Sequence, residues 1–154
     1  MALDIGSPAP DFRLAGAEGE PIALADFAGR KLVLYFYPKD DTSGCTREAK
    51  DFTALRQNFA EAGTDILGVS PDGPRSKAKF AKKHGLSIAL GADEEKQAAQ
   101  AYGVWVEKSM WGRRYMGIER TTFLIDRNGA IARIWPKVSV AGHAQDVLEA
   151  ARGL

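Results

Sequence analysis

Cysteine is almost absent from this sequence, since Cys45 is the only one among 154 residues. A chain with one cysteine cannot form an internal disulfide, a CxxC redox pair or a zinc site built from several cysteines. The charges nearly cancel, because 21 Lys and Arg stand against 20 Asp and Glu for a net charge of +1. No strong electrostatic field is therefore available to attract DNA, RNA or an anionic membrane.

Long apolar runs are also absent. No stretch approaches the roughly 20 residues that span a bilayer, and residues 1–10 lack the basic and apolar regions of a signal peptide. The longest strongly apolar run, residues 32–37, suits a buried strand. A lone thiol fits a reducing compartment, so we expect a soluble cytoplasmic protein.

Histidine is scarce as well, and it suggests no metal site. His84 and His143 lie far apart, and neither has a metal-ligating partner at helical spacing. We expect both to be surface or capping residues. Lys77, Lys79, Lys82 and Lys83 are expected to form a solvated basic face of one helix.

What remains is the composition of an ordinary globular protein, with 45% hydrophobic and 27% charged residues. The length suits a single domain covering residues 1–154. Apolar periodicity predicts strands at residues 12–14, 21–24, 31–37, 64–70, 88–90, 104–106, 114–116, 121–125 and 130–135. Helices are predicted at residues 45–62, 75–84, 94–102 and 142–151.

This order of elements predicts an α/β sandwich. Strands alternate with helices over the first two thirds of the chain, and a hairpin and a helix end it. We expect a short N-terminal hairpin and a central mixed β-sheet with helices on both faces. The ending is that of a thioredoxin-like fold.

Cys45 occupies a position that favours chemistry. It follows a buried strand, Pro38 and a polar loop, and it opens a helix. The first turn of a helix presents free N–H groups and the positive end of the macrodipole, and both stabilise a thiolate. The alternative is that Cys45 is a small buried apolar residue, which is the commoner role of a lone cysteine.

The residues around Cys45 resemble a known active site. The segment YPKDDTSGCTREA, residues 37–49, contains the spacing Pro38-x-x-x-Thr42-x-x-Cys45. This pattern is similar to the active-site motif of peroxiredoxins, and its flanks resemble the bacterioferritin-comigratory, PrxQ-type branch. The likeness continues in residues 6–12, 102–104 and 116–126, the last of which includes Arg120.

The resemblance implies a role for each matching residue. Cys45 is the peroxidatic cysteine, whose thiolate attacks a peroxide oxygen and becomes a sulfenic acid. Thr42 offers a hydroxyl to the thiolate or the peroxide, and Pro38 shapes and shields the pocket. Arg120 stabilises the thiolate and the charge on the departing oxygen, and the N–H groups of Gly44 and Cys45 donate to the peroxide.

Each of these residues also has a plain structural reading. Thr42 can be an N-cap, Pro38 a strand terminator and Arg120 a surface arginine. Glu48 lies one helical turn beyond Cys45, where it can orient Arg120 or be a solvated helix charge.

One departure from the family pattern bears on the mechanism. Many PrxQ-type proteins carry a resolving cysteine five residues after the peroxidatic one, where this sequence has Lys50, and others carry it in the next helix, which has none here. The resemblance therefore implies a peroxidase that reduces hydrogen peroxide and small organic hydroperoxides with one cysteine. Thioredoxin, glutaredoxin and glutathione are all open as the external reductant.

The implied enzyme needs no metal, haem or flavin, and its PrxQ-type relatives suggest a monomer. The loop rich in aromatic and basic residues at 105–114 is expected to form a pocket rim or a partner-docking surface. The alternative function is a non-catalytic redox sensor or client-binding module that forms mixed disulfides at Cys45. Repeated turnover of peroxide would separate an enzyme from such a sensor.

Overall fold

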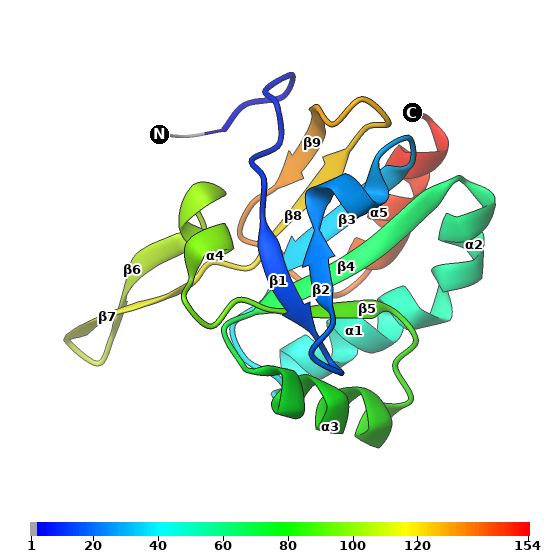
Figure 1. The fold of residues 1–154 in the computed structure, drawn as a ribbon. Helices are drawn as coiled ribbons and strands as arrows, with labels where there is room; N and C mark the ends of the chain where they lie inside the picture. Colours follow the sequence, from blue (N-terminus) through cyan, green and yellow to red (C-terminus); the bar gives the residue numbers. More distant parts are fainter. Residues whose placement is uncertain (1–2) are drawn as a thin grey trace.

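The structure is a computed structural model that describes residues 3–154, with a seven-stranded mixed sheet at its centre (Figure 1). The strand order is β2-β1-β5-β4-β3-β8-β9, and a separate two-stranded sheet is formed by β6 and β7. Neighbours β3 and β4, and β4 and β5, are parallel, whereas the other pairs are antiparallel. The strands are β1 (Arg13–Gly16), β2 (Pro21–Ala23), β3 (Lys31–Phe36), β4 (Thr64–Ser70), β5 (Ala89–Ala92), β6 (Trp105–Met110), β7 (Arg113–Ile118), β8 (Thr121–Ile125) and β9 (Ile131–Trp135).

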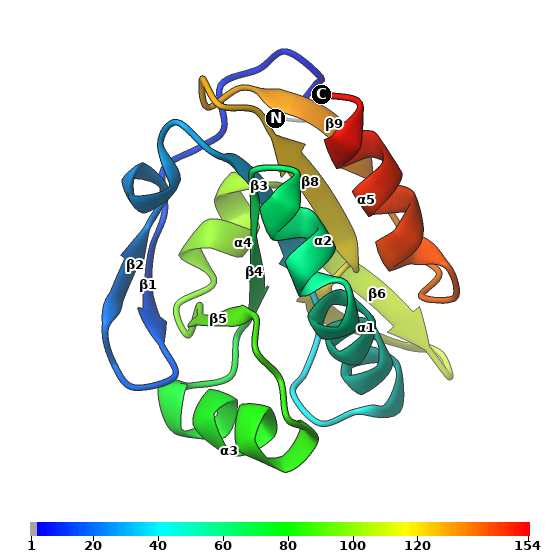
Figure 2. The same ribbon diagram turned by 90° about the vertical axis from the view of Figure 1, so that its right-hand side faces the viewer.

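Helices cover both faces of the sheet, as the sequence predicts. Helices α1, α2 and α5 lie on one face and α4 on the other, while α3 lies near the ends of β1 and β5 (Figures 1 and 2). The helices are the 3-10 helix η1 (Leu24–Phe27), α1 (Ser43–Ala54), α2 (Arg56–Glu61), α3 (Pro74–His84), α4 (Gln97–Ala101) and α5 (His143–Arg152).

Strand β3 separates the two halves of the core. Every residue of β3 is buried, because neighbouring strands flank it and helices cover its two faces. Leu32, Leu34 and Phe36 face one apolar cluster, and Val33 and Tyr35 face the other. The second cluster includes Cys45, so the sulfur lies against the core on the α1 side of the sheet.

Four elements differ most from their predicted bounds. The helix expected at residues 45–62 is interrupted at Leu55, where ψ is 4°, although its apolar pattern continues across the break. Helix α4 begins only at Gln97, because Lys96 has a φ of 55°, which is outside the helical range. Strands β6 and β7 are longer than expected, because Trp111 and Gly112 both have positive φ and make the tight hairpin turn.

Two expectations about polar side chains were wrong. Lys77 does not belong to a solvated face, since it is 0% exposed, and His143 is buried rather than on the surface. Both pair with partners that the local sequence does not reveal. Lys77 bonds Asp40, and His143 Nε2 lies 2.8 Å from Thr122 Oγ1. Periodicity identifies a helix, but it does not show which polar groups lie across from it.

Residues 3–154 contain no helix that is long and apolar enough to cross a membrane. Within the same residues, no three His, Cys, Asp or Glu side chains are grouped so that they could hold a metal ion.

Candidate active site

The site is built where β3 ends and α1 begins. The Tyr37 N–H still donates to the Val69 carbonyl at 3.0 Å, but Pro38 has no N–H to continue the ladder. The chain then turns through a loop, residues 38–42, and α1 starts at Ser43. In α/β proteins, ligands bind and active sites form beside the carboxyl ends of the parallel strands.

Cys45 lies in the first turn of α1, as the sequence predicts. The Thr46 N–H makes the first intrahelical bond, to the Thr42 carbonyl at 2.8 Å. The N–H groups of Gly44 and Cys45 therefore precede the intrahelical ladder and remain available to an anion. The Cys45 residue is only 2% exposed.

Arg120 contacts the sulfur directly. Its Nη2 donates to Cys45 Sγ at 3.2 Å, and its Nη1 donates to Glu48 Oε1 at 2.6 Å. Arg120 stands between β7 and β8, whereas Cys45 and Glu48 share one face of α1. The fold thus brings Arg120 to Cys45 and Glu48, which lie 75 and 72 residues from it in the sequence. The bond to Glu48 fixes the orientation of the guanidinium.

Burial decides the electrostatics of this group. Burial raises the pKa of Glu48 to about 7, against the opposing effect of Arg120 and with a small contribution from Asp51. Burial also pulls the pKa of Arg120 down, but Glu48 and Cys45 outweigh it and the pKa is raised. The guanidinium is therefore a permanent cation beside the sulfur, and the charge of Glu48 changes near neutral pH.

The Thr42 hydroxyl bonds the backbone of the loop and not the sulfur. Its Oγ1 donates to the Lys39 carbonyl at 3.0 Å, and no hydrogen bond joins it to Cys45 among the described residues. Thr42 is the N-cap of α1 by its backbone, but its hydroxyl makes no capping bond. Because the single hydroxyl proton faces Lys39, the group offers its lone pairs to other donors.

The remaining site residues shape the surroundings. Pro38 is half-buried at the start of the loop. A Cβ placed on Gly44 would meet Arg120 Nη2 at 3.3 Å, so the absence of a side chain gives the guanidinium room beside the start of α1. Two buried polar atoms of this region, Tyr35 Oη and Glu48 Oε2, have no hydrogen-bond partner among the described residues.

One protein-family model matches a segment of the chain that contains these site residues. The model of the AhpC/TSA family matches residues 5–134, which include Pro38, Thr42, Cys45, Glu48 and Arg120. The chain belongs to the AhpC/TSA family.

Similar proteins of this family are peroxiredoxins. Peroxiredoxin Bcp of Bacillus subtilis is 47% identical over 97% of this chain and 95% of its own. A putative peroxiredoxin of Coxiella burnetii is 45% identical over 96% of this chain and 98% of its own. A cysteine mutant of Xanthomonas campestris peroxiredoxin Q superposes with a TM-score of 0.92, at 42% identity over 98% of this chain and 99% of that one.

These matches confirm the resemblance, the thioredoxin-like fold and the enzyme class that the sequence predicts. This AhpC/TSA member is a thiol-dependent peroxidase. Solved structures of the Xanthomonas relative include serine mutants of two different cysteines, whereas the present chain has only Cys45.

Sequence reasoning missed one part of the site. The motif gives Asp40 no role, yet Asp40 is 7% exposed and forms an ion pair with Lys77. A charged residue in a loop is normally solvated, so the sequence held no local sign of this burial.

Proposed function

We propose that this chain reduces hydrogen peroxide and small organic hydroperoxides through Cys45 alone, with an external thiol as the source of electrons. The observation that carries the proposal is the contact of Arg120 with the Cys45 sulfur at 3.2 Å, with Glu48 holding the guanidinium at 2.6 Å. The guanidinium can stabilise negative charge on the sulfur and on the departing oxygen during the attack on a peroxide.

In the first step, the Cys45 thiolate attacks one oxygen of the peroxide. An S–O bond forms while the O–O bond breaks, the sulfur is oxidised to the sulfenic acid, and the second oxygen leaves as hydroxide or alkoxide. A proton from solvent converts this leaving group to water or an alcohol. The negative charge moves from sulfur to oxygen, so donors fixed around both atoms stabilise the transition state.

The surrounding residues divide this task. Arg120 and the N–H groups of Gly44 and Cys45 face the developing negative charge. The Thr42 hydroxyl, whose proton is directed to Lys39, accepts a hydrogen bond from the peroxide O–H and aligns it. Pro38 shields the sulfur from bulk water, and Glu48 positions Arg120.

The second step uses thiols from outside the chain. One thiol attacks the sulfenic sulfur and releases water, which leaves a mixed disulfide. A second thiol then attacks this disulfide, so that the external disulfide departs and the Cys45 thiolate returns. Thioredoxin, glutaredoxin and glutathione all have this chemistry.

We also propose that the enzyme works as a cytoplasmic monomer. The residues assigned to the reaction all come from one chain, so no second copy is needed to complete the site. A reduced lone thiol also fits a reducing compartment.

Peroxide consumption tests the proposal. The protein is supplied with hydrogen peroxide or an alkyl hydroperoxide and with the thioredoxin system, the glutaredoxin system or glutathione in turn. We expect repeated turnover with at least one reductant and none for Cys45→Ser. Consumption of a single equivalent with every reductant would instead support a redox sensor.

A further inference from the structure

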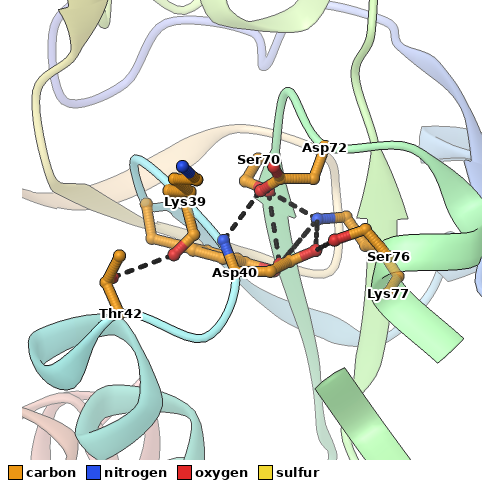
Figure 3. Close-up of polar contacts among 8 residues, drawn as sticks. Lys39, Asp40, Thr42, Ser70, Asp72, Ser76 and Lys77 are labelled. Carbon is orange, nitrogen blue, oxygen red and sulfur yellow. Dashed lines mark hydrogen bonds and ion pairs between the residues drawn. The ribbon is translucent and has the colours of Figure 1, made fainter. Parts of the chain in front are cut away.

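A buried polar network lies beneath the active-site loop, and the mechanism above does not use it. Lys77 Nζ, from α3, donates to Ser70 Oγ at 2.5 Å, to Tyr37 Oη at 3.0 Å and to Asp40 Oδ1 at 3.1 Å. The Lys77 side chain is 0% exposed and that of Asp40 is 4% exposed. Figure 3 shows Lys77 reaching Asp40 and Ser70 from its helix.

Asp40 has a full set of partners. Tyr37 Oη donates to its Oδ1 at 2.6 Å, and Ser76 Oγ donates to its Oδ2 at 2.7 Å. A buried carboxylate and a buried ammonium are each costly in isolation, so each depends on the other. The network therefore specifies one position of the loop against α3.

A single peptide unit connects this network to Thr42. The Asp40 N–H donates to Asp72 Oδ2 at 2.7 Å, and the Lys39 carbonyl of the same peptide accepts the Thr42 hydroxyl at 3.0 Å. Asp72 Oδ2 also accepts from Ser70 Oγ at 2.8 Å, and Ser70 in turn bonds Lys77. Because a peptide unit is planar and rigid, a tilt that moves the Asp40 N–H also moves the Lys39 carbonyl to which the Thr42 hydroxyl donates (Figure 3).

Helix α3 also holds the next residue of the loop. Asp41 accepts from Lys83 Nζ at 2.7 Å, and its other oxygen lies 2.7 Å from His84 Nε2. Asp41 has a φ of 62°, in the left-handed region that non-glycine residues adopt infrequently. Two consecutive residues of the loop are thus fixed from one helix.

We infer that Lys77 is a positioning residue for the peroxidase reaction: through Asp40 and the Lys39–Asp40 peptide, it orients the Thr42 hydroxyl toward the peroxide. The inference rests on the role proposed for Thr42. Without the ammonium, the Asp40 carboxylate turns toward water, the peptide tilts with it, and the hydroxyl loses its alignment. Misplacement by about 1 Å is enough to slow a reaction of this kind by up to roughly a hundredfold.

A double-mutant cycle tests this connection. Lys77→Met keeps an unbranched side chain and removes the charge, and Thr42→Val removes the hydroxyl. The rate of Cys45 oxidation is measured for the parent, both single variants and the double variant, by competition for hydrogen peroxide against a reference peroxidase. We expect Lys77→Met to slow the parent about tenfold but to slow the Thr42→Val background less than about twofold.

Lys79→Met is the matched control, because Lys79 is exposed on the same helix and its replacement changes the net charge equally. It should react like the parent. The same factor for Lys77→Met in both backgrounds would show that Lys77 does not act through Thr42. A parent that reacts with peroxide while Lys77→Met reacts equally fast would refute only this inference, whereas an unreactive parent would refute the proposed function as well.

Asp72 provides a second test that leaves Lys77 and Asp40 themselves unchanged, and it reaches Lys77 only through Ser70. Asp72→Ala removes the acceptor of the Asp40 N–H and should slow peroxide oxidation, whereas Asp72→Asn keeps an acceptor oxygen and should restore most of the rate. This pair decides the question if Lys77→Met fails to fold. Equal rates for Asp72→Ala and the parent would overturn the inference.

Discussion

Arg120 donates to the sulfur of Cys45 at 3.2 Å, although 75 residues separate the two in the sequence. The same guanidinium is held by Glu48, which lies one turn along the helix from Cys45. The Cys45 sulfur, the Arg120 guanidinium and the Glu48 carboxylate are therefore linked by consecutive hydrogen bonds. We expect a substitution of any of the three residues to change the rate of the reaction with peroxide.

Replacing Arg120 tests its contact with the Cys45 sulfur. Arg120→Met removes the cation and leaves Glu48 buried without its partner, so we expect peroxide oxidation of Cys45 to slow by about a hundredfold or more. Alkylation by iodoacetamide at neutral pH should slow too, because it also requires the thiolate. Arg114→Met is the control, since Arg114 is exposed on β7. Unchanged alkylation in Arg120→Met would contradict a thiolate held by Arg120.

Protonation of Glu48 is expected to make the unfolding free energy depend on pH. Because burial raises its pKa from 4.5 to about 7, the folded state binds this proton more tightly than the unfolded state between these values. The contribution of Glu48 to the unfolding free energy is then fully present below pH 4.5 and is lost as the pH rises through about 7. For one proton, the unfolding free energy changes by at most about 1.4 kcal/mol per pH unit. Denaturant unfolding of the parent and Glu48→Gln should show that this component is missing from the variant; identical pH profiles would argue against it.

His143 is expected to act in the opposite direction. Burial lowers its pKa from 6.5 to about 4, so the unfolded state binds the proton more tightly. The stability contributed by neutral His143 is present above pH 6.5 and is lost as the pH falls toward 4. In the parent this loss overlaps the gain from Glu48, and Glu48→Gln should therefore reveal a steeper acid destabilisation. Added to Glu48→Gln, His143→Gln should flatten the profile between these pH values, and acid sensitivity equal to that of Glu48→Gln alone would exclude His143 as its source.

Substitutions of Thr42 test whether its hydroxyl aligns the peroxide or whether the residue only packs at the start of the helix. Thr42→Ser keeps the hydroxyl and should retain most of the rate with peroxide. Thr42→Val is nearly isosteric but cannot bond the peroxide or Lys39, and we expect a loss on the order of a hundredfold. Rapid mixing with hydrogen peroxide measures both. Equal rates for Thr42→Val and the parent would show that the residue only begins the helix.

The lone cysteine determines how the enzyme is inactivated. With no second thiol in the chain, sulfenic acid should accumulate when reductant is withheld, and further peroxide should convert it to sulfinic acid. Mass spectrometry after graded peroxide should show the addition of two oxygens. A stable disulfide-linked dimer without any sulfinic form would instead indicate resolution between two Cys45 thiols.

Lys50→Cys places a second thiol on an exposed position of α1, five residues beyond Cys45. The helix must unwind locally before the sulfurs can meet, because a disulfide needs Cα atoms within about 7 Å and suitably directed side chains. We expect the variant to form an internal disulfide and to resist sulfinic acid formation. The exposed neighbour Arg47→Cys, too close along the chain to pair without greater distortion, serves as the comparison. Equal over-oxidation of all three proteins would show that α1 does not open.

The sequence identified the features that depend on neighbours along the chain. Strand β3 is a continuous apolar run, α3 ends at His84 as predicted, and Pro38 and Thr42 precede Cys45 in the loop that leads to α1. The break at Leu55 could not be predicted, because the apolar pattern runs through it without proline or glycine.

By itself, then, the sequence predicted a single cysteine at the start of a helix on an α/β fold, because helix and strand signals extend over only a few residues. The motif around Cys45 carried the resemblance to peroxiredoxins. The tertiary structure alone decided which distant groups meet. Arg120 contacts the sulfur, and Lys77 is buried rather than solvated, because Asp40 lies 37 residues away in the sequence and within 3.1 Å in space. A buried charge is tolerated only beside its partner, and that pairing exists only once β3, β4 and α3 have packed together.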